Sequence, residues 1–219
     1  MRLNLFGIDP ASAIQLTAAI AKKYGAEVGV RRHCGGWSVI VSSSELFLRE
    51  AESCLYPMAF LADNPAKWAV ETLAQRKETI TFAESCTGGA LAARFVSVAG
   101  ASSVLEGSLV TYSNRLKQAW LGVDGATLER FGAVSEPCVL QMATGAIART
   151  GATRALAISG IAGPNGGTIA KPVGTVFVGY ADAGVQFAEE LRLVGSRQAV
   201  QRQAVFNAMR LLIARLLRA

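Results

Sequence analysis

Histidine is nearly missing from this chain, which has one, His33, in 219 residues. A Ser-His-Asp triad is not expected, because His33 lies outside the part of the chain with the pattern of an α/β fold. A metal site built from histidines is excluded for the same reason. A nucleophilic serine in this protein would therefore need lysine, tyrosine or a carboxylate as its base.

Cysteine is scarce and scattered, and Cys34, Cys54, Cys86 and Cys138 form no Cys-x-x-Cys pair. We expect free thiols in a reducing cytoplasm, with no zinc or other metal site. Long apolar runs are missing too, so no membrane span is predicted, and the first residues lack the apolar segment of a signal peptide. We therefore expect a cytoplasmic protein with no membrane partner and no cofactor.

Apolar residues, in contrast, are plentiful: they make up 51% of the chain, and the mean hydropathy is +0.32. This composition supports a well-buried core and argues against disorder. The net charge of +6 comes mostly from dispersed arginines. One small anionic ligand explains this charge as well as nucleic acid does, and we do not expect nucleic acid to be the partner.

The chain has two parts with different patterns. The pattern of residues 1–63 predicts a small α+β unit of unknown role. Arg31, Arg32 and His33 are expected in a loop between two of its strands. Asp63-Asn64-Pro65 is a polar turn at the expected junction. Residues 64–219 alternate between strands and helices, which indicates an α/β layer fold.

Three apolar strands of the second part end in small polar loops: at Ser85, at Tyr112-Ser113-Asn114 and at Ser159-Gly160. If these strands are parallel, the loops lie at one edge of the sheet, where α/β proteins bind ligands. The first loop, residues 83–89, precedes a helix, so its backbone N–H groups could receive an anion. A plain strand–helix turn capped by Ser or Thr would give the same pattern.

If Ser85 is a nucleophile, lysine is the best available base, and the second part has Lys67, Lys77, Lys117 and Lys171. Lys67 and Lys77 precede the first strand of this part, so they lie at its amino end, whereas Ser85 follows its carboxyl end. A lysine that is partly desolvated has a lowered pKa and can activate a serine. Lys117 is our first candidate and Lys171 the second, with an exposed helix charge as the alternative interpretation of Lys117.

Six motifs follow one another between about Trp68 and Arg218. They are Ala-Glu-Ser-Cys-Thr-Gly-Gly at 83–89, Thr-Tyr-Ser-Asn-x-x-Lys at 111–117, Gly-Ala-Val-Ser-Glu-Pro at 132–137, Ser-Gly-Ile-Ala-Gly-Pro-x-Gly-Gly at 159–167, Lys-Pro-Val-Gly-Thr-Val at 171–176 and Gly-x-Arg at 195–197. In this order they resemble the C-terminal domain of the competence/damage-inducible CinA family, a domain similar to stand-alone nicotinamide-mononucleotide deamidases. The resemblance implies a three-layer α/β/α sandwich with a mixed, mostly parallel sheet. It also implies hydrolysis of the carboxamide of nicotinamide mononucleotide to nicotinate mononucleotide and ammonia, in pyridine nucleotide salvage.

By this resemblance the family's nucleophile falls on Ser85 and its assisting pair on Tyr112 and Lys117, in agreement with the elimination above. Backbone N–H groups near Thr87 and Gly88 are expected to hold the oxyanion. We also expect a homo-oligomer that binds a small nucleotide. Substrate contacts are expected from Glu84, Thr87, Gly88, Gly89, Asn114, Ser159, Gly160, Gly163, Lys171, Arg197 and Arg202.

Two features depart from the family pattern. Many members have Arg at the position of Gln201, whereas here Arg202 comes one residue later, about 100° further around a helix. Residues 1–63 do not resemble the molybdopterin-binding-like domain of full-length CinA proteins, and are either a shortened connecting region or an unrelated addition. These departures leave a catalytically silent nucleotide-binding or regulatory protein as the alternative function. RNA binding by residues 1–63 is a third interpretation.

Overall fold

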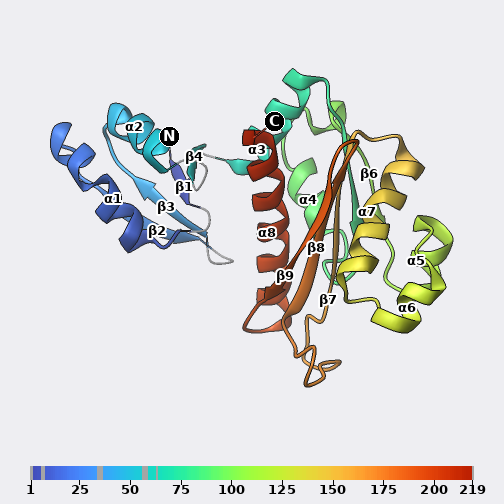
Figure 1. Ribbon diagram of the computed structural model, residues 1–219. Helices are drawn as coiled ribbons and strands as arrows, with labels where there is room; N and C mark the ends of the chain where they lie inside the picture. The colour runs from blue at the N-terminus through green and yellow to red at the C-terminus, as the bar shows by residue number, and fades with distance from the viewer. Residues whose placement is uncertain (1, 6–7, 34–36, 56–58, 63, 219) are drawn as a thin grey trace. The chain divides into compact units, whose positions relative to one another are not determined.

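The computed structural model describes residues 2–5, 8–33, 37–55, 59–62 and 64–218. The chain divides into two compact units, one of Met1–Pro65 with Leu217–Ala219 and one of Ala66–Leu216 (Figure 1). Within the described residues, no helix combines the length and the apolar character needed to span a membrane.

The first unit has two helices and a four-stranded antiparallel sheet in the order β2-β3-β1-β4. Asp9 caps its first helix, because its carboxylate accepts from the N–H groups of Ala11 and Ser12. The order of its elements is that of ferredoxin-like α+β folds. The elements are β1 (Leu3–Leu5), α1 (Pro10–Lys23), β2 (Gly29–His33), β3 (Trp37–Val41), α2 (Glu45–Leu55) and β4 (Ala59–Leu61).

One expectation for this unit was wrong, and one of its strands was not predicted. Residues 31–33 were assigned to a loop, but they lie in β2, where Arg31 pairs with Val39. β2 is an edge strand, and charged side chains are favoured there because they discourage pairing with another chain. The three residues of β4 were too short a segment to be predicted. Residues 34–36 of the expected loop and residue 63 of the expected junction lie outside the described residues.

The second unit is a three-layer α/β/α sandwich whose sheet has the order β6-β5-β7-β8-β9. β5 is parallel to β6 and β7, while β8 is antiparallel to β7 and β9. The predicted mixed, mostly parallel sheet is thus confirmed, since only β8 runs against the others. The elements are α3 (Pro65–Arg76), β5 (Ile80–Glu84), α4 (Ala90–Val96), the 3₁₀ helix η1 (Ala101–Ser103), β6 (Leu105–Val110), α5 (Asn114–Leu121), α6 (Gly125–Phe131), α7 (Glu136–Thr150), β7 (Arg154–Gly160), β8 (Thr175–Asp182), β9 (Gln186–Arg192) and α8 (Arg197–Arg218).

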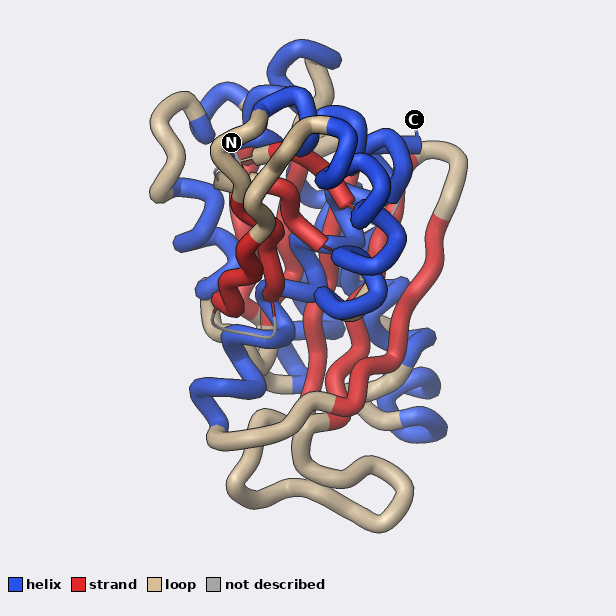
Figure 2. Tube along the Cα trace, turned by 90° about the vertical axis from the view of Figure 1, so that its left-hand side faces the viewer, coloured by secondary structure: helices blue, strands red, loops and turns tan. Residues whose placement is uncertain are grey.

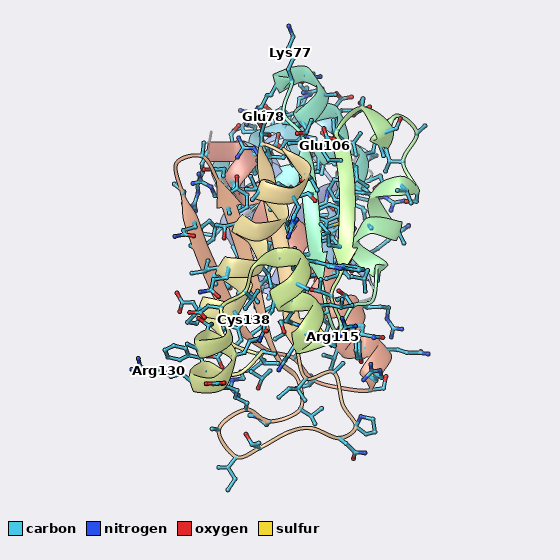
Figure 3. The ribbon with its side chains drawn as sticks, turned by 90° about the vertical axis from the view of Figure 1, so that its right-hand side faces the viewer. Lys77, Glu78, Glu106, Arg115, Arg130 and Cys138 are labelled. Atoms are coloured by element: carbon cyan, nitrogen blue, oxygen red, sulfur yellow. The ribbon has the colours of Figure 1, made fainter. Side chains whose placement is uncertain are left out.

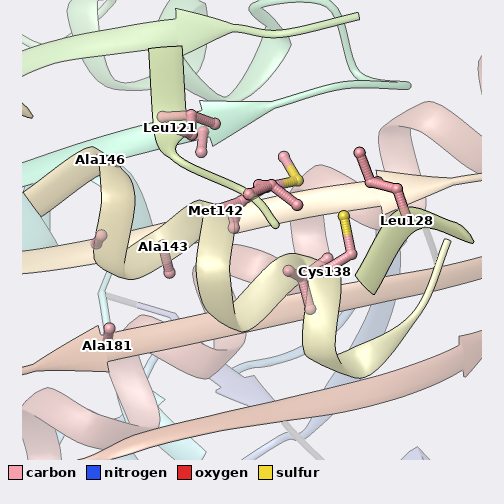
Figure 4. Packing of buried hydrophobic residues seen from close by; sticks show 12 residues of the cluster. Leu121, Leu128, Cys138, Met142, Ala143, Ala146 and Ala181 are labelled. Carbon is pink, nitrogen blue, oxygen red and sulfur yellow. The ribbon is translucent and has the colours of Figure 1, made fainter. Parts of the chain in front are cut away.

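The two faces of the sheet bury different side chains. Figure 1 shows α7 on one side of the sheet and α4 and α8 on the other. Small residues such as Ala83 and Ala157 belong to one buried cluster with Met142 of α7. Figure 4 shows Met142 and Ala143 of α7 in this cluster. On the opposite face, the ring of Phe82 meets that of Phe95 from α4, with centroids 4.9 Å apart. Since side chains alternate along a strand, the residues that follow Ala83 also alternate between these two sides.

The two ends of the sheet also differ in character. At the amino ends of the parallel strands, the nearly buried guanidinium of Arg154 pairs with the carboxylates of Glu78 and Asp182. Figure 3 shows Lys77 and Glu78 at this end and Cys138 at the other. Lys77 is therefore at the wrong end to serve the loops that follow β5, β6 and β7, as the sequence predicted. Those three loops meet at the carboxyl edge.

Candidate active site

Ser85 directly follows β5 at the carboxyl edge. Its N–H still bonds to the carbonyl of Ile158 on β7 at 3.0 Å, so the sheet fixes its backbone. Strand alternation turns Ser85 to the side of Ala83, the side of α5 and α7, and its side chain is only 8% exposed. The turn beyond it needs positive φ, which Gly88 (61°) and Gly89 (97°) supply at little cost. The sheet thus fixes the backbone of the nucleophile candidate on one side, and the turn through the two glycines follows on the other.

Glu84 points to the other side of the sheet, toward α4. Its fully buried carboxylate accepts from the N–H groups of Gly89, Leu91 and Ala92 at 3.0 to 3.1 Å, and from the hydroxyl of Ser108 at 3.2 Å. Glu84 therefore caps α4 from inside the protein. The helix N-terminus that the sequence offered to an anion is filled by this side chain. We therefore drop Glu84 and the N–H of Gly89 from the expected substrate contacts.

Lys117 reaches Ser85 from the neighbouring helix α5. Ser113 caps this helix by accepting from the N–H of Leu116 at 3.2 Å, and Lys117 lies one turn further on. The Lys117 side chain is 1% exposed, and its Nζ lies 3.1 Å from Ser85 Oγ. This is the serine–lysine pair that the elimination of other bases favoured, and its burial removes the alternative of an exposed helix charge.

Two backbone carbonyls complete the surroundings of Lys117. Nζ lies 2.7 Å from the oxygen of Thr111 and 3.4 Å from that of Tyr112. A neutral amine can donate its two hydrogens to these carbonyls and aim its lone pair at the Ser85 hydroxyl. No ion pair joins Lys117 to a carboxylate among the described residues. Burial lowers the pKa of Lys117, which favours that neutral form.

The phenol of Tyr112 is directed elsewhere. Tyr112 is 61% exposed, and its hydroxyl accepts from Arg197 Nη2 at 2.8 Å, while Arg197 Nη1 bonds to the carbonyl of Gly163 at 2.9 Å. The structure therefore connects Tyr112 to Lys117 through a backbone carbonyl, and connects its side chain to α8. Arg197 joins the loop after β6 to the loop after β7.

Gln201 makes a contact that the sequence did not predict. Its Nε2 donates to the carbonyl of Cys86 at 2.7 Å and so ties α8 to the loop that carries Ser85. Gln201 and Arg197 are four residues apart and share one face of the helix. Arg202 lies off that face and is exposed, with no hydrogen bond or ion pair to the described residues. The spacing of Arg197 and Gln201 was the signal that could have revealed this second contact.

The other expected residues are spread around this centre. Lys171, the second candidate base, donates to the carbonyl of Phe131 at the end of α6 at 2.7 Å and has no contact with Ser85. Asn114 is exposed at the first position of α5. Ser159 is buried at the end of β7, and a side chain at Gly160 would come within 2.5 Å of Val176. The long loop of residues 161–174, seen below the strands in Figure 2, follows them.

The geometry at the carboxyl edge is therefore that of a buried serine–lysine pair beside an arginine. Residues 63–216 match the CinA C-terminal domain. The chain belongs to the CinA family. Among the described residues, no group of three or more His, Cys, Asp and Glu side chains could hold a metal ion.

Longer relatives and solved structures support this membership. A protein of Desulforudis audaxviator, named as competence-damage inducible, is 36% identical over 96% of this chain and 45% of its own length. A CinA-like protein of Akkermansia muciniphila is 44% identical over 87% of this chain and 48% of its own. The chain thus spans about half the length of these curated relatives. A match over 96% of the chain takes in most of residues 1–63, so the first unit also has a counterpart in this relative.

Two crystal structures of CinA-family proteins resemble the second unit closely. The competence/damage inducible protein CihA from Agrobacterium tumefaciens is 37% identical and covers 72% of this chain and 98% of its own, with a TM-score of 0.66. A CinA superfamily protein from Klebsiella pneumoniae is 38% identical and covers 71% of this chain and 97% of its own, with a TM-score of 0.68. The sandwich fold is therefore that of the family.

Proposed function

We propose that this protein hydrolyses the carboxamide of nicotinamide mononucleotide to nicotinate mononucleotide and ammonia. The observation that carries the proposal is the buried contact of 3.1 Å between Lys117 Nζ and Ser85 Oγ, with no carboxylate of the described residues paired with the lysine. This pair can perform acyl transfer without histidine. The identity of the substrate comes from the resemblance of the motifs to nicotinamide-mononucleotide deamidases.

The proposed reaction has two halves. Neutral Lys117 takes the proton of Ser85, whose Oγ attacks the carboxamide carbon and forms a tetrahedral intermediate. The resulting ammonium of Lys117 returns that proton to the leaving nitrogen, the C–N bond breaks, and ammonia departs from a Ser85 ester. Lys117 then takes a proton from the water that attacks the ester and returns it to the departing Ser85 Oγ, and the carboxylic acid formed loses its proton to solvent.

The donors for the oxyanion differ from those expected. The N–H of Gly88 bonds to the carbonyl of Ser85 at 3.1 Å and closes a turn, so it is already in use. The N–H of Thr87, inside that turn, donates to no other described residue. We therefore assign the oxyanion to Thr87 rather than to Gly88.

Arg197 is the group best suited to an anionic part of the substrate. Its two hydrogen bonds in the structure go to neutral oxygens, the phenol of Tyr112 and the carbonyl of Gly163. A guanidinium held by neutral acceptors keeps its full charge and a fixed position. It can therefore bind a phosphate without first breaking an ion pair.

The direct test is ammonia release from purified protein supplied with nicotinamide mononucleotide, with and without EDTA. We expect ammonia and nicotinate mononucleotide in equal amounts, and the same rate with EDTA. A Ser85→Ala preparation supplies the blank. Ammonia no higher than this blank would overturn the proposed activity, and loss of activity with EDTA would overturn the metal-free mechanism.

The alternative is a catalytically silent nucleotide-binding or regulatory protein. The observation that favours it is Gln201, a neutral side chain whose nitrogen is already bonded to Cys86 and which offers no charge to a phosphate. This alternative predicts binding of nicotinamide mononucleotide by calorimetry with no ammonia produced. The intact pair of Ser85 and Lys117 favours the enzyme.

Tyr112→Phe separates two possible roles of the phenol. Because the Tyr112 hydroxyl contacts Arg197 and the carbonyl remains for Lys117, we expect kcat to change little. KM should rise by about tenfold, because Arg197 loses an acceptor that fixes its position. Steady-state kinetics of ammonia release measure both constants. A fall in kcat of about a hundredfold at unchanged KM would instead make the phenol a proton carrier.

A further inference from the structure

Three buried polar atoms of the described side chains lack a hydrogen-bond partner, and two of them belong to residues that neighbour the serine–lysine pair, one in the turn that starts at Ser85 and one whose carbonyl accepts from Lys117. They are the hydroxyl oxygens of Thr87 and Thr111, and the third is Nε of Arg215. Folded proteins satisfy nearly all buried polar groups, so each exception calls for an explanation. An unmade bond of this kind costs free energy in the folded state, and a ligand can supply the missing partner.

Thr87 and Thr111 differ in what the rest of the residue does. The N–H of Thr111 bonds to Glu84 at 2.9 Å, and its carbonyl accepts from Lys117. Thr87 sits at the third position of the turn from Ser85 to Gly88, where a backbone N–H has no acceptor within the turn. Its N–H and its hydroxyl are therefore both without a partner among the described residues, although Thr87 is only 4% exposed. Two donors of one buried residue thus remain free, two positions beyond Ser85.

We propose that the Thr87 hydroxyl is a second oxyanion donor, which acts with the N–H of the same residue during acylation of Ser85. The inference rests on the proposed acyl-transfer function and adds a side chain to its machinery. As Ser85 Oγ bonds to the carbonyl carbon, the carbonyl oxygen becomes negative and takes hydrogen bonds from both Thr87 groups. When the leaving group departs, the C=O bond re-forms and the oxygen loses its negative charge.

The test uses an activated ester, so that it does not depend on nicotinamide mononucleotide. With p-nitrophenyl acetate, Ser85 Oγ attacks the acetyl carbon, p-nitrophenolate leaves, and Lys117 takes the proton. Its release is followed in the wild type, Thr87→Val and Thr87→Ser, and the rate of Ser85→Ala is subtracted. Valine keeps the shape of threonine without the hydroxyl, and serine keeps the hydroxyl without the methyl group. The ammonia assay and the melting temperature are measured on the same proteins.

Thr127→Val is the matched control. Thr127 is buried like Thr87, with 8% exposure against 4%. Its hydroxyl, however, accepts from Gln141 Nε2 at 3.0 Å. The same substitution there leaves a donor unpaired, so the melting temperature should fall while the acylation rate stays unchanged. Thr87→Val should do the opposite: the acylation rate falls about a hundredfold, and the melting temperature is no lower than that of the wild type. Thr87→Ser should keep most of the rate.

Each other outcome is decisive. A wild-type acylation rate in Thr87→Val overturns the inference, and so does a melting temperature that falls as far as in Thr127→Val, because the hydroxyl would then have a partner in the folded protein. Absence of any Ser85-dependent acylation in the wild type overturns it too. If acylation depends on the Thr87 hydroxyl but nicotinamide mononucleotide yields no ammonia, the inference holds and the proposed substrate is wrong.

Discussion

Ser85→Ala should abolish turnover, with kcat reduced by on the order of 10⁴-fold or more, because no other described group is placed to form the acyl intermediate. The substitution removes one buried oxygen and leaves Lys117, Thr87 and Arg197 in place. Binding of nicotinamide mononucleotide, measured by calorimetry, should therefore change little. Rapid-mixing kinetics should also show no covalent intermediate in this variant.

Cys86→Ala is the matched control for that result, because Cys86 is the neighbouring nucleophile. Burial raises the pKa of the Cys86 thiol to about 11, so almost none of it is thiolate at neutral pH. We expect this variant to keep most of the activity. If Cys86→Ala were inactive and Ser85→Ala active, the nucleophile would be the thiol.

Lys117→Arg should lose about 10³-fold in kcat, although it keeps the positive charge. A guanidinium cannot give up its proton at neutral pH, so it cannot accept the proton of Ser85. Lys117→Met should lose about as much, because it also lacks a base. Equal losses in the two variants identify proton transfer as the role of Lys117. Activity of Lys117→Arg within tenfold of the wild type would reduce that role to electrostatic support.

The pH dependence of the wild type provides a second measure of the same role. Burial lowers the pKa of Lys117 below the usual value for lysine, about 10.4. The active form is the neutral amine, so kcat/KM, which reports the free enzyme, should fall as the pH falls through the lowered pKa. Between that pKa and the usual one, the unfolded chain binds a proton that the folded protein does not. Folding stability should therefore rise with pH across this interval.

The sequence predicted the serine–lysine pair because it offered so few alternatives. One histidine outside the α/β part left lysine as the base, and the parallel strands brought the Ser85 and Tyr112 loops to one edge. The direction of the Tyr112 phenol could not be predicted, since it depends on Arg197, which is 85 residues away in the chain. The contact of Gln201 with Cys86 spans 115 residues, and its local sign was the four-residue spacing from Arg197, which does not identify the partner.

Glu84 and Ser85 are adjacent in the chain but point to opposite sides of the sheet. From the sequence, Glu84 was expected to contact the substrate and Ser85 to act as the nucleophile, both from one loop. Strand alternation alone places adjacent residues on opposite faces, so only one of them could face the site. The alternation also explains why Glu84 meets α4 and Ser85 meets α5. Residues 31–33 were assigned to a loop because their side chains are polar. An edge strand also tolerates polar side chains, so this pattern did not distinguish the two.

The internal cap made by Glu84 bears on how fast this protein could react once a ligand arrives. The Glu84 carboxylate accepts hydrogen bonds from the N–H groups of Gly89, Leu91 and Ala92. The conformation of the segment after Ser85 is therefore fixed when the chain folds. This segment does not have to be ordered when a ligand binds, so the entropy of that step does not add to the activation barrier. Differences in turnover between candidate amides should then reflect the chemistry of the amide itself and its fit to Arg197.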